Sequence, residues 1–206
     1  MFTGIIAGVG YVTEATLSKE ILRLGIKTTQ GQGLIIGASV AVDGVCLTAV
    51  KQEDDVVFFD VISETLSKTT LGSLKKDSKV HIERSLKLGD ELGGHLVSGH
   101  VHGVGRVTSL QTSPWVMSIE VSPQLSKYIF EKGFISLAGA SLTVVSVRDH
   151  VFSVALIPET LKVTKFKEAQ LGDLFNVEVD QSTRTIVDQV EAAVAKLYQA
   201  KQNPIE

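Results

Sequence analysis

The sequence predicts an all-β fold made of two similar tandem copies, followed by a C-terminal helix. Three observations carry this prediction. Short stretches of alternating apolar and polar residues lie between glycine-rich turns, which favours a barrel or a sandwich. The tail after Asp180 has apolar residues at helical spacing. A phrase of the form Gly-x-nucleophile-Leu-Thr occurs twice, as Gly44-Val45-Cys46-Leu47-Thr48 and Gly139-Ala140-Ser141-Leu142-Thr143.

The second copy follows the first at a constant offset of 95 residues, as Gly44 and Gly139 show. This period is far longer than the roughly 20 to 50 residues of solenoid repeats, so each copy is a small domain. A polar, glycine-rich stretch at 85–94 separates them. We therefore expect domains at 1–90 and 91–182 and a helix with its tail at 183–206. The offset also matches Gly4 with Gly99, Gly8 with Gly103, Glu64 with Glu159, Thr65 with Thr160, and Glu83 with Glu178.

Composition narrows the class of protein. The 206 residues carry a net charge of −3 and no basic, aromatic-rich patch, which disfavours nucleic acid as a partner. No apolar run approaches the roughly 18 residues of a membrane span, and the first residues lack the pattern of a signal peptide. Cys46 is the only cysteine, so no intrachain disulfide can form. We expect no membrane association and a reducing, cytoplasmic setting.

Strand signals dominate both copies. Closing such strands into a barrel would hide the edges that a small β domain otherwise exposes. Alternating or β-branched segments are found at Val56–Val61, Val80–Glu83, Trp115–Val121 and Phe175–Glu178.

Two stretches have helical signals. Ser122 and Pro123 suit a helix start, and Gly133 suits a stop. The tail has a heptad spacing of apolar residues, which fits either packing on its own barrel or self-association between chains. The apolar positions of this tail are Ile186, Val190, Ala193 and Leu197.

Cys46 and Ser141 occupy the same position of the two copies. A lone cysteine is often only a small buried hydrophobe, but a polar counterpart in an equally glycine-rich phrase favours function. The hydroxyls of Thr48 and Thr143 and nearby backbone groups can hydrogen-bond the edge of a flat heterocycle.

Glu64-Thr65 and Glu159-Thr160 each follow an apolar strand. Either copy alone could simply cap a turn. Retention of both residue types in both copies favours binding, because a carboxylate accepts hydrogen bonds from vicinal hydroxyls of a polyol.

Three histidines, His95, His100 and His102, cluster between the copies. A metal site is not expected, because there is no second thiol and one face of a β-strand would carry only His100 and His102. Acid–base chemistry or ligand contact fits imidazole better, since it titrates near neutral pH. His102 can equally be a plain strand or turn residue.

Four motifs carry a resemblance to a known family. They are Met1–Ile6, Gly93–Val101, Ser141–Thr143 and Leu156–Leu161. In their order and spacing, over about residues 1 to 200, the chain resembles the riboflavin synthase family with its tandem lumazine-binding repeat. The resemblance implies two similar six-stranded antiparallel β-barrels, a C-terminal helix that joins a homotrimer, and a possible association with lumazine synthase.

The resemblance also implies a reaction. Two molecules of 6,7-dimethyl-8-ribityllumazine dismutate, and one gives a four-carbon unit to the other. The products are riboflavin and 5-amino-6-ribitylamino-uracil, and no metal or organic cofactor is required. Each barrel binds one lumazine, and the site forms where the N-terminal barrel of one chain faces the C-terminal barrel of its neighbour.

The family's site residues carry over by motif. The resemblance implies catalytic roles for His100, Ser141, Cys46, Asp180 and Lys132. In the first barrel it implies ligand contacts from Gly4, Ile5, Ile6, Cys46, Leu47, Thr48, Asp60, Val61, Ile62, Ser63, Glu64 and Thr65, with Phe2 and Ser39 near the site. In the second barrel it implies contacts from Gly99, His100, Val101, Lys132, Ser141, Leu142, Thr143, Ala155, Leu156, Ile157, Pro158, Glu159 and Thr160.

The chain departs from the family at two positions. Ala138 stands where the family usually has Asp, and His102 stands where an acidic residue is common. Either the acid at 138 is dispensable, or Asp180 or a water replaces it, or turnover is reduced. The alternative function is a non-catalytic lumazine- or flavin-binding antenna protein. Retention of Leu-Thr and Glu-Thr in both copies favours the enzyme, and a ligand-free interaction module would leave the matched nucleophile positions unexplained.

Overall fold

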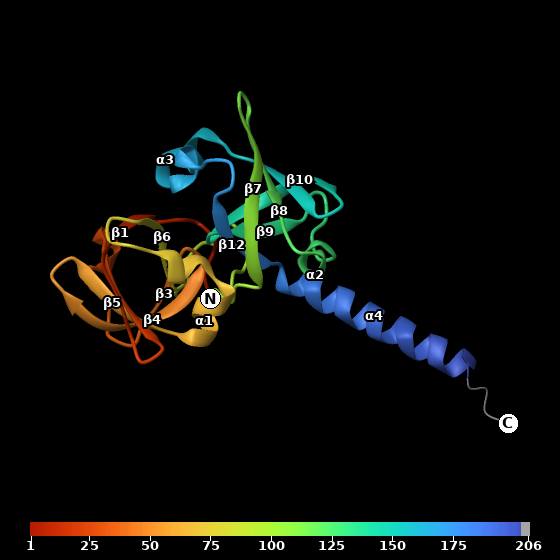
Figure 1. The fold of residues 1–206 in the computed structure, drawn as a ribbon, viewed down its shortest axis with the longest axis horizontal. Helices are drawn as coiled ribbons and strands as arrows, with labels where there is room; N and C mark the ends of the chain where they lie inside the picture. The colour runs from red at the N-terminus through yellow and green to blue at the C-terminus, as the bar shows by residue number, and fades with distance from the viewer. Residues whose placement is uncertain (203–206) are drawn as a thin grey trace.

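The computed structural model describes residues 1–202, which form two closed β-barrels and a projecting helix (Figure 1). All strand pairs are antiparallel, and the first barrel closes in the order β1-β2-β5-β4-β3-β6. Its strands are β1 (Gly8–Ser18), β2 (Ile21–Lys27), β3 (Ser39–Val42), β4 (Val45–Glu53), β5 (Val56–Ile62) and β6 (Lys79–Arg84).

The second barrel repeats this arrangement and closes in the order β10-β11-β8-β7-β12-β9. The six-stranded antiparallel barrels expected from the resemblance are confirmed. The strands are β7 (Gly103–Thr112), β8 (Trp115–Glu120), β9 (Phe134–Leu137), β10 (Ala140–Arg148), β11 (Val151–Ala155) and β12 (Leu174–Val179).

Irregular features repeat as faithfully as the strands. A bulge at Val12/Glu14 of β1 recurs at Val107/Ser109 of β7, at the same offset. A short helix follows the fifth strand of each barrel, and a 3-10 turn follows that helix. These elements are α1 (Ser63–Lys68), η2 (Thr70–Ser73), α3 (Pro158–Val163) and η3 (Lys165–Glu168), while η1 (Thr29–Gly31) lies between β2 and β3.

Each barrel encloses its own apolar core. Phe59 and Leu24 fill the first barrel, and Phe152 and Met117 fill the second, all essentially without solvent exposure. Burying each such side chain contributes roughly 1.5–3 kcal/mol. The alternating pattern that predicted β8 holds, because Met117 and Ile119 point into the core and Glu120 points out.

The last strand of each barrel differs from the simple alternation that its sequence suggests. Residues 80–83 of β6 and 175–179 of β12 are buried on both faces. The polar residues that a two-sided strand would send to solvent, His81 and Glu83 in β6 and Asn176 and Glu178 in β12, are buried between the barrels. Their polar atoms form hydrogen bonds with the other copy or with the segment that precedes a barrel, as described below.

The helix expected between Ser122 and Gly133 is wrong in length. Only α2 (Pro123–Ser126) forms, and turns follow it. Leu125 and Ile129 turn into the core of the second barrel, and Lys132 adopts a left-handed backbone with φ +65°. The apolar residues of this stretch therefore close the end of the barrel instead of forming one helical face.

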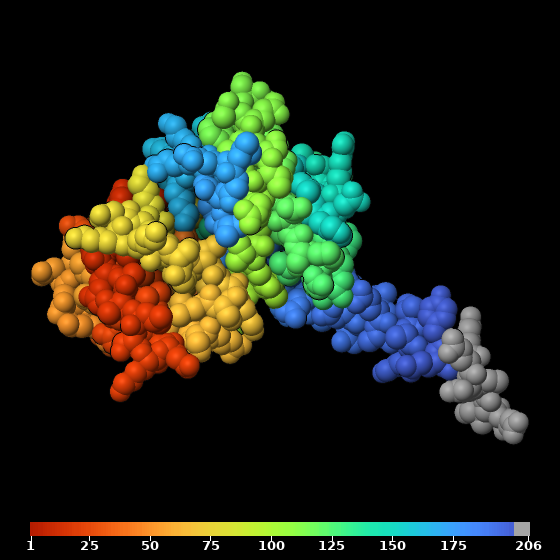
Figure 2. Space-filling model, in the orientation of Figure 1, coloured from red at the N-terminus to blue at the C-terminus, as the bar shows by residue number. Residues whose placement is uncertain are grey.

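The C-terminal helix α4 (Gln181–Gln202) leaves the second barrel and projects from it (Figures 1 and 2). Tyr128 donates a 2.5 Å hydrogen bond to Asp188, and Lys127 pairs with Glu191, so the first half of α4 is held near α2. Ile186, Val190 and Leu197 of α4 are exposed. None of the helices within residues 1–202 is long and apolar enough to cross a membrane. Residues 203–206 of the predicted tail lie outside the described part of the chain.

Candidate active site

Cys46 lies on β4 beside a hollow at the end of the first barrel. Its backbone N–H donates a 2.9 Å hydrogen bond to the carbonyl oxygen of Gly99, which belongs to the segment before the second barrel. A cavity of about 220 Å³ lies beside it. The cavity is lined by Val45, Cys46, Glu64, Thr65, Lys68, Thr69, Gly99, His100 and Val101.

Ser141 occupies the same place on β10 of the second barrel. Its backbone N–H donates a 2.8 Å hydrogen bond to the carbonyl oxygen of Gly4. Its Oγ lies 2.7 Å from Nδ1 of His95, and the imidazole stacks on the ring of Phe134 with centroids 5.1 Å apart. A hydroxyl with a hydrogen-bonded, oriented imidazole is an arrangement that supports proton transfer or nucleophilic attack.

The segments before the two barrels therefore cross over. The segment at 3–4 precedes the first barrel but contacts Ser141 of the second, and the segment at 98–99 precedes the second barrel but contacts Cys46 of the first. This reverses the grouping implied by the resemblance. Gly4 and Ile6 contact the second barrel, whereas Gly99, His100 and Val101 contact the first. Ile5 lies beside Gly93 and the end of β6.

Two buried glutamates hold these crossing segments. Glu83 of β6 accepts hydrogen bonds from the backbone N–H and hydroxyl of Thr3, at 2.6 and 2.8 Å, and from the N–H of Gly4 at 3.1 Å. Glu178 of β12 accepts the same three bonds from Ser98 and Gly99. Burial raises the pKa of both carboxyls, although these hydrogen bonds oppose the shift.

The crossing requires glycine at the contact points. A Cβ on Gly4 would lie 2.5 Å from Cβ of Ser141, and a Cβ on Gly99 would lie 2.6 Å from Cβ of Cys46. Both glycines also have positive φ angles, +73° and +80°. Only a residue without Cβ allows the segments to lie directly against the nucleophile-bearing strands.

His95 contacts the hydroxyl of Ser141, although the resemblance does not include it among the site residues. Burial lowers the pKa of its imidazole, with a smaller opposing effect from the carboxylate of Asp180, so the neutral form is favoured near pH 7. Repeat matching could not find His95, because the offset of 95 places its counterpart before Met1. The available signal was its position in the Gly93–Val101 motif, two residues after Gly93.

Other implied contacts fall into exposed and buried groups. The exposed or half-buried ones are Ser39, Thr48, Ile62, Ser63, Glu64 and Thr65 in the first barrel, and Lys132, Thr143, Ala155, Ile157, Pro158, Glu159 and Thr160 in the second. Of these, Glu64 and Thr65 line the cavity beside Cys46. Leu47, Val61, Leu142 and Leu156 point into the cores, so only their backbone groups face a ligand. Asp60 forms a bidentate ion pair with Arg23.

Phe2 is completely buried and packs with Ala41, Val97 and the side chain of Cys46. Its backbone pairs with Val97 in both directions, at 2.7 and 3.0 Å. The buried ring of Phe2 therefore belongs to the apolar cluster against which the Cys46 side chain packs.

Ala138 and His102 are the two positions that depart from the family. Ala138 is buried where the barrels meet, and its counterpart Asp43 also points into that contact. Asp180 accepts hydrogen bonds from Thr183 at the start of α4. His102 precedes β7 instead of lying on a strand beside His100, and its Nδ1 accepts a 3.2 Å hydrogen bond from the N–H of Val179.

The family model of the lumazine binding domain matches the chain twice, at residues 3–85 and 98–180. A riboflavin synthase of Chlamydia pneumoniae is 45% identical over 197 residues, which cover 95% of this chain and 98% of that protein. The chain belongs to the riboflavin synthase family. The riboflavin synthase of Escherichia coli K12 is 39% identical over 99% of this chain and 98% of its own length.

A crystal structure of LumP complexed with riboflavin superposes with a TM-score of 0.81 and 25% identity, covering 88% of this chain and all of LumP. Membership in the riboflavin synthase family, over nearly the full length, supports an enzyme of the transferase type over the non-catalytic alternative.

Proposed function

We propose that this chain is a riboflavin synthase. It converts two molecules of 6,7-dimethyl-8-ribityllumazine into riboflavin and 5-amino-6-ribitylamino-uracil. The observation that carries the proposal is the presence of two equivalent sites in one chain. Each site has a nucleophile on the same strand position, Cys46 or Ser141. His95 is hydrogen-bonded to Ser141, and His100 lines the same cavity as Cys46.

A dismutation needs no external oxidant or reductant, because the four carbons that one lumazine loses are the four that the other gains. The 7-methyl group of lumazine is acidic, since the ring delocalises the resulting carbanion, so a strong base is unnecessary. The main task of the protein is to hold two identical molecules face to face with their reacting atoms close together. Such positioning can lower a barrier by about 7–11 kcal/mol.

The two sites are equivalent in place but different in chemistry. In the second site, the neutral imidazole of His95 can receive a proton through Ser141 or from the substrate. In the first site, Cys46 and His100 stand at the same cavity. The glutamates and threonines at the barrel ends, Glu64 with Thr65 and Glu159 with Thr160, are suited to a ribityl chain. Lys132 and Asp180 complete the set of proposed catalytic residues.

The sites are proposed to meet across subunits of a homotrimer. Ile186, Val190 and Leu197 are more than half exposed along α4, and such a stripe is normally covered by another helix. A cytoplasmic location fits the single thiol, Cys46. Association with lumazine synthase is a further proposal, which co-sedimentation of the two proteins would test.

One experiment tests the activity. The protein is incubated with 6,7-dimethyl-8-ribityllumazine alone, and riboflavin is followed by its absorbance and by chromatography, with 5-amino-6-ribitylamino-uracil expected in equal amount. Lumazine that binds without forming product would contradict the enzyme and support a binding protein. No spectral change on mixing would contradict both.

A further inference from the structure

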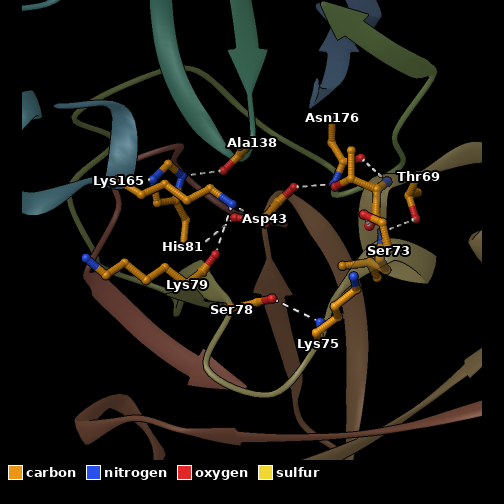
Figure 3. A network of polar contacts seen from close by, with 12 residues as sticks. Asp43, Thr69, Ser73, Lys75, Ser78, Lys79, His81, Ala138, Lys165 and Asn176 are labelled. Carbon is orange, nitrogen blue, oxygen red and sulfur yellow. Dashed lines mark hydrogen bonds and ion pairs between the residues drawn. The ribbon is translucent and has the colours of Figure 1, made fainter. Parts of the chain in front are cut away.

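Gly44 and Gly139 lie against each other where the two barrels meet. Hydrogen bonds cross this contact in reciprocal pairs (Figure 3). His81 Nδ1 donates to the carbonyl oxygen of Ala138 at 2.9 Å, and its Nε2 accepts from the N–H of Lys165 at 2.9 Å. In the other half, Asn176 takes the place of His81. Its Nδ2 donates to the carbonyl of Asp43 at 2.9 Å, and its Oδ1 accepts from the N–H of Thr70 at 2.8 Å.

The symmetry of these bonds ends at the side chains of Asp43 and Lys165. Lys165 Nζ lies 2.5 Å from Asp43 Oδ2 and 3.1 Å from the carbonyl oxygen of Lys79. The other carboxylate oxygen of Asp43 accepts a 2.8 Å bond from the N–H of His81. At the equivalent places of the other half stand Ala138 and Thr70, which cannot form an ion pair.

This ion pair is the most buried in the described part of the chain. The side chain of Asp43 is 2% exposed and that of Lys165 is 18% exposed, whereas both partners in every other pair are at least 33% exposed. Lys165 reaches the carboxylate from η3 of the second barrel, and Asp43 belongs to the first. The pair therefore joins the two barrels by charge on one side only.

Asp43 is also close to the first site along the chain. It forms the β3–β4 turn with Gly44, and its backbone adopts φ +46°, a conformation that few residues tolerate. Cys46 follows three residues later on β4. A shift of this turn would move the start of β4 and, with it, the thiol and the hydrogen bond from Cys46 to Gly99.

We propose that Lys165 is a positioning residue for the first site: through Asp43 it fixes the β3–β4 turn and thereby the place of Cys46. The inference rests on the proposed function, since it assigns Lys165 a role in binding at that site. Ser141 has no such support, because its own turn carries Ala138. The ion pair thus makes the two otherwise equivalent sites depend on the barrel contact to different degrees.

Removing Lys165 alone would leave a buried carboxylate without its counter-charge, which is far more disruptive than removing both partners. The decisive comparison is therefore between Lys165→Thr and the double variant Asp43→Asn/Lys165→Thr. Asn at 43 can still accept the bond from His81 and suits a positive φ. Thr is the residue at the equivalent place, Thr70. Lys167→Thr, at an exposed position of the same short helix, is the matched control.

The readout is the reactivity of Cys46, the only thiol of the chain. Its alkylation by iodoacetamide is measured at 20 °C with increasing riboflavin, the unreactive product, and the half-protecting concentration reports binding at the first site. We expect Lys165→Thr to raise that concentration about tenfold or more, because it leaves the buried carboxylate unpaired. The double variant and Lys165→Arg should return near the wild-type value, and Lys167→Thr should not change it.

A purely stabilising role predicts a different result. If Lys165→Thr lowers the melting temperature but leaves the half-protecting concentration at 20 °C unchanged, the proposal is wrong. Lys165→Gln, which can still reach the carboxylate, provides a milder variant should Lys165→Thr fail to fold, and an unchanged value for it would equally overturn the proposal. If the wild-type protein neither forms riboflavin nor shows protection, the proposed function fails instead.

Discussion

Gly44 and Gly139 lie so close together that neither has room for a Cβ, and each belongs to the turn that leads to a nucleophile. A Cβ on Gly44 would lie 2.5 Å from the backbone nitrogen of Gly139, and a Cβ on Gly139 would lie 2.9 Å from the nitrogen of Gly44. The same pair opens the repeated phrase in the sequence. Glycine is thus required there by the approach of two backbones, in addition to any role beside a ligand.

Gly139→Ala should separate the barrels or strain their turns. Gly172→Ala is its control, because Gly172 has nearly the same φ angle (+89° against +88°) but nothing within 4 Å of the added Cβ. We expect Gly139→Ala to lower the free energy of unfolding by roughly 1–3 kcal/mol more than Gly172→Ala does, the usual range for overpacking. Urea unfolding of both variants measures the difference, and equal losses would show that the backbone contact is unimportant.

Glu178→Gln should disturb the first site from the second barrel. The substitution replaces one carboxylate oxygen by an NH2 group. That group donates hydrogen bonds and so cannot accept those of Ser98 or Gly99. We therefore expect faster alkylation of Cys46, on the order of severalfold, as its contact with Gly99 loosens. Glu83→Gln removes the same bonds from the segment against Ser141. It should leave Cys46 alkylation nearly unchanged, and a similar rise in both variants would contradict the crossing.

His95→Ala should lower turnover strongly, on the order of 10²–10⁴-fold, if its imidazole moves protons with Ser141. Initial rates of riboflavin formation measure this effect, and circular dichroism checks the fold. His95→Gln separates proton transfer from hydrogen bonding, because the amide can bond Ser141 but cannot titrate. Recovery of full activity in His95→Gln would assign His95 an orienting role only.

Acid should weaken the fold through His81. Burial lowers the pKa of His81 to about 4, below its ordinary value of 6.5, so the unfolded chain binds the extra proton between these values. Stability should therefore fall as pH decreases from about 6.5 to 4, by at most about 3 kcal/mol from this residue. His81→Asn, which introduces the side chain that Asn176 carries at the equivalent place, should flatten that part of the pH profile in urea unfolding.

His102 should contribute to the acid response independently of His81. Burial, assisted by the nearby charge of Arg184, also lowers the pKa of His102 to about 4. His102→Asn should therefore remove a separate part of the same slope. An unchanged pH profile in His81→Asn would mean that His81 binds protons equally in the folded and unfolded states.

Substitution of the apolar stripe on α4 should abolish the proposed homotrimer. Val190→Glu places a charge at the middle of the stripe, whereas Gln189→Glu adds the same charge at a neighbouring exposed polar position. We expect monomers for Val190→Glu in sedimentation velocity and an unchanged assembly for Gln189→Glu. Trimers of Val190→Glu would show that another surface joins the chains.

Much of the fold was predictable, because duplication makes weak local signals count twice. The offset that matches Gly44 with Gly139 also fixes equivalent strands, bulges and helices. The helix after Ser122 was mispredicted because Leu125 and Ile129, although suitably spaced, are used to close a barrel end. Helical spacing alone does not distinguish these two uses.

The site was less predictable for a physical reason. Local sequence places Cys46 and Ser141 on their strands, but the segments that contact them come from the opposite copy. No periodicity reveals that Gly4 crosses to Ser141 or that Glu83 holds it there. Likewise, Glu83 and Glu178 resemble solvent-facing positions of alternating strands until the crossing segments bury them.

His81 and Asn176 occupy equivalent positions of the two copies but are different residue types, which bears on how duplicated halves diverge. Each position must offer one donor to a carbonyl and one acceptor to an N–H at fixed separation. A neutral imidazole and a carboxamide both satisfy this requirement. An apolar side chain has neither group, and lysine has donors but no acceptor. Substitutions at this position are thus confined to the few residue types that offer both groups. The two copies of an ancestral barrel can therefore carry different residues there while the contact between the barrels keeps its geometry.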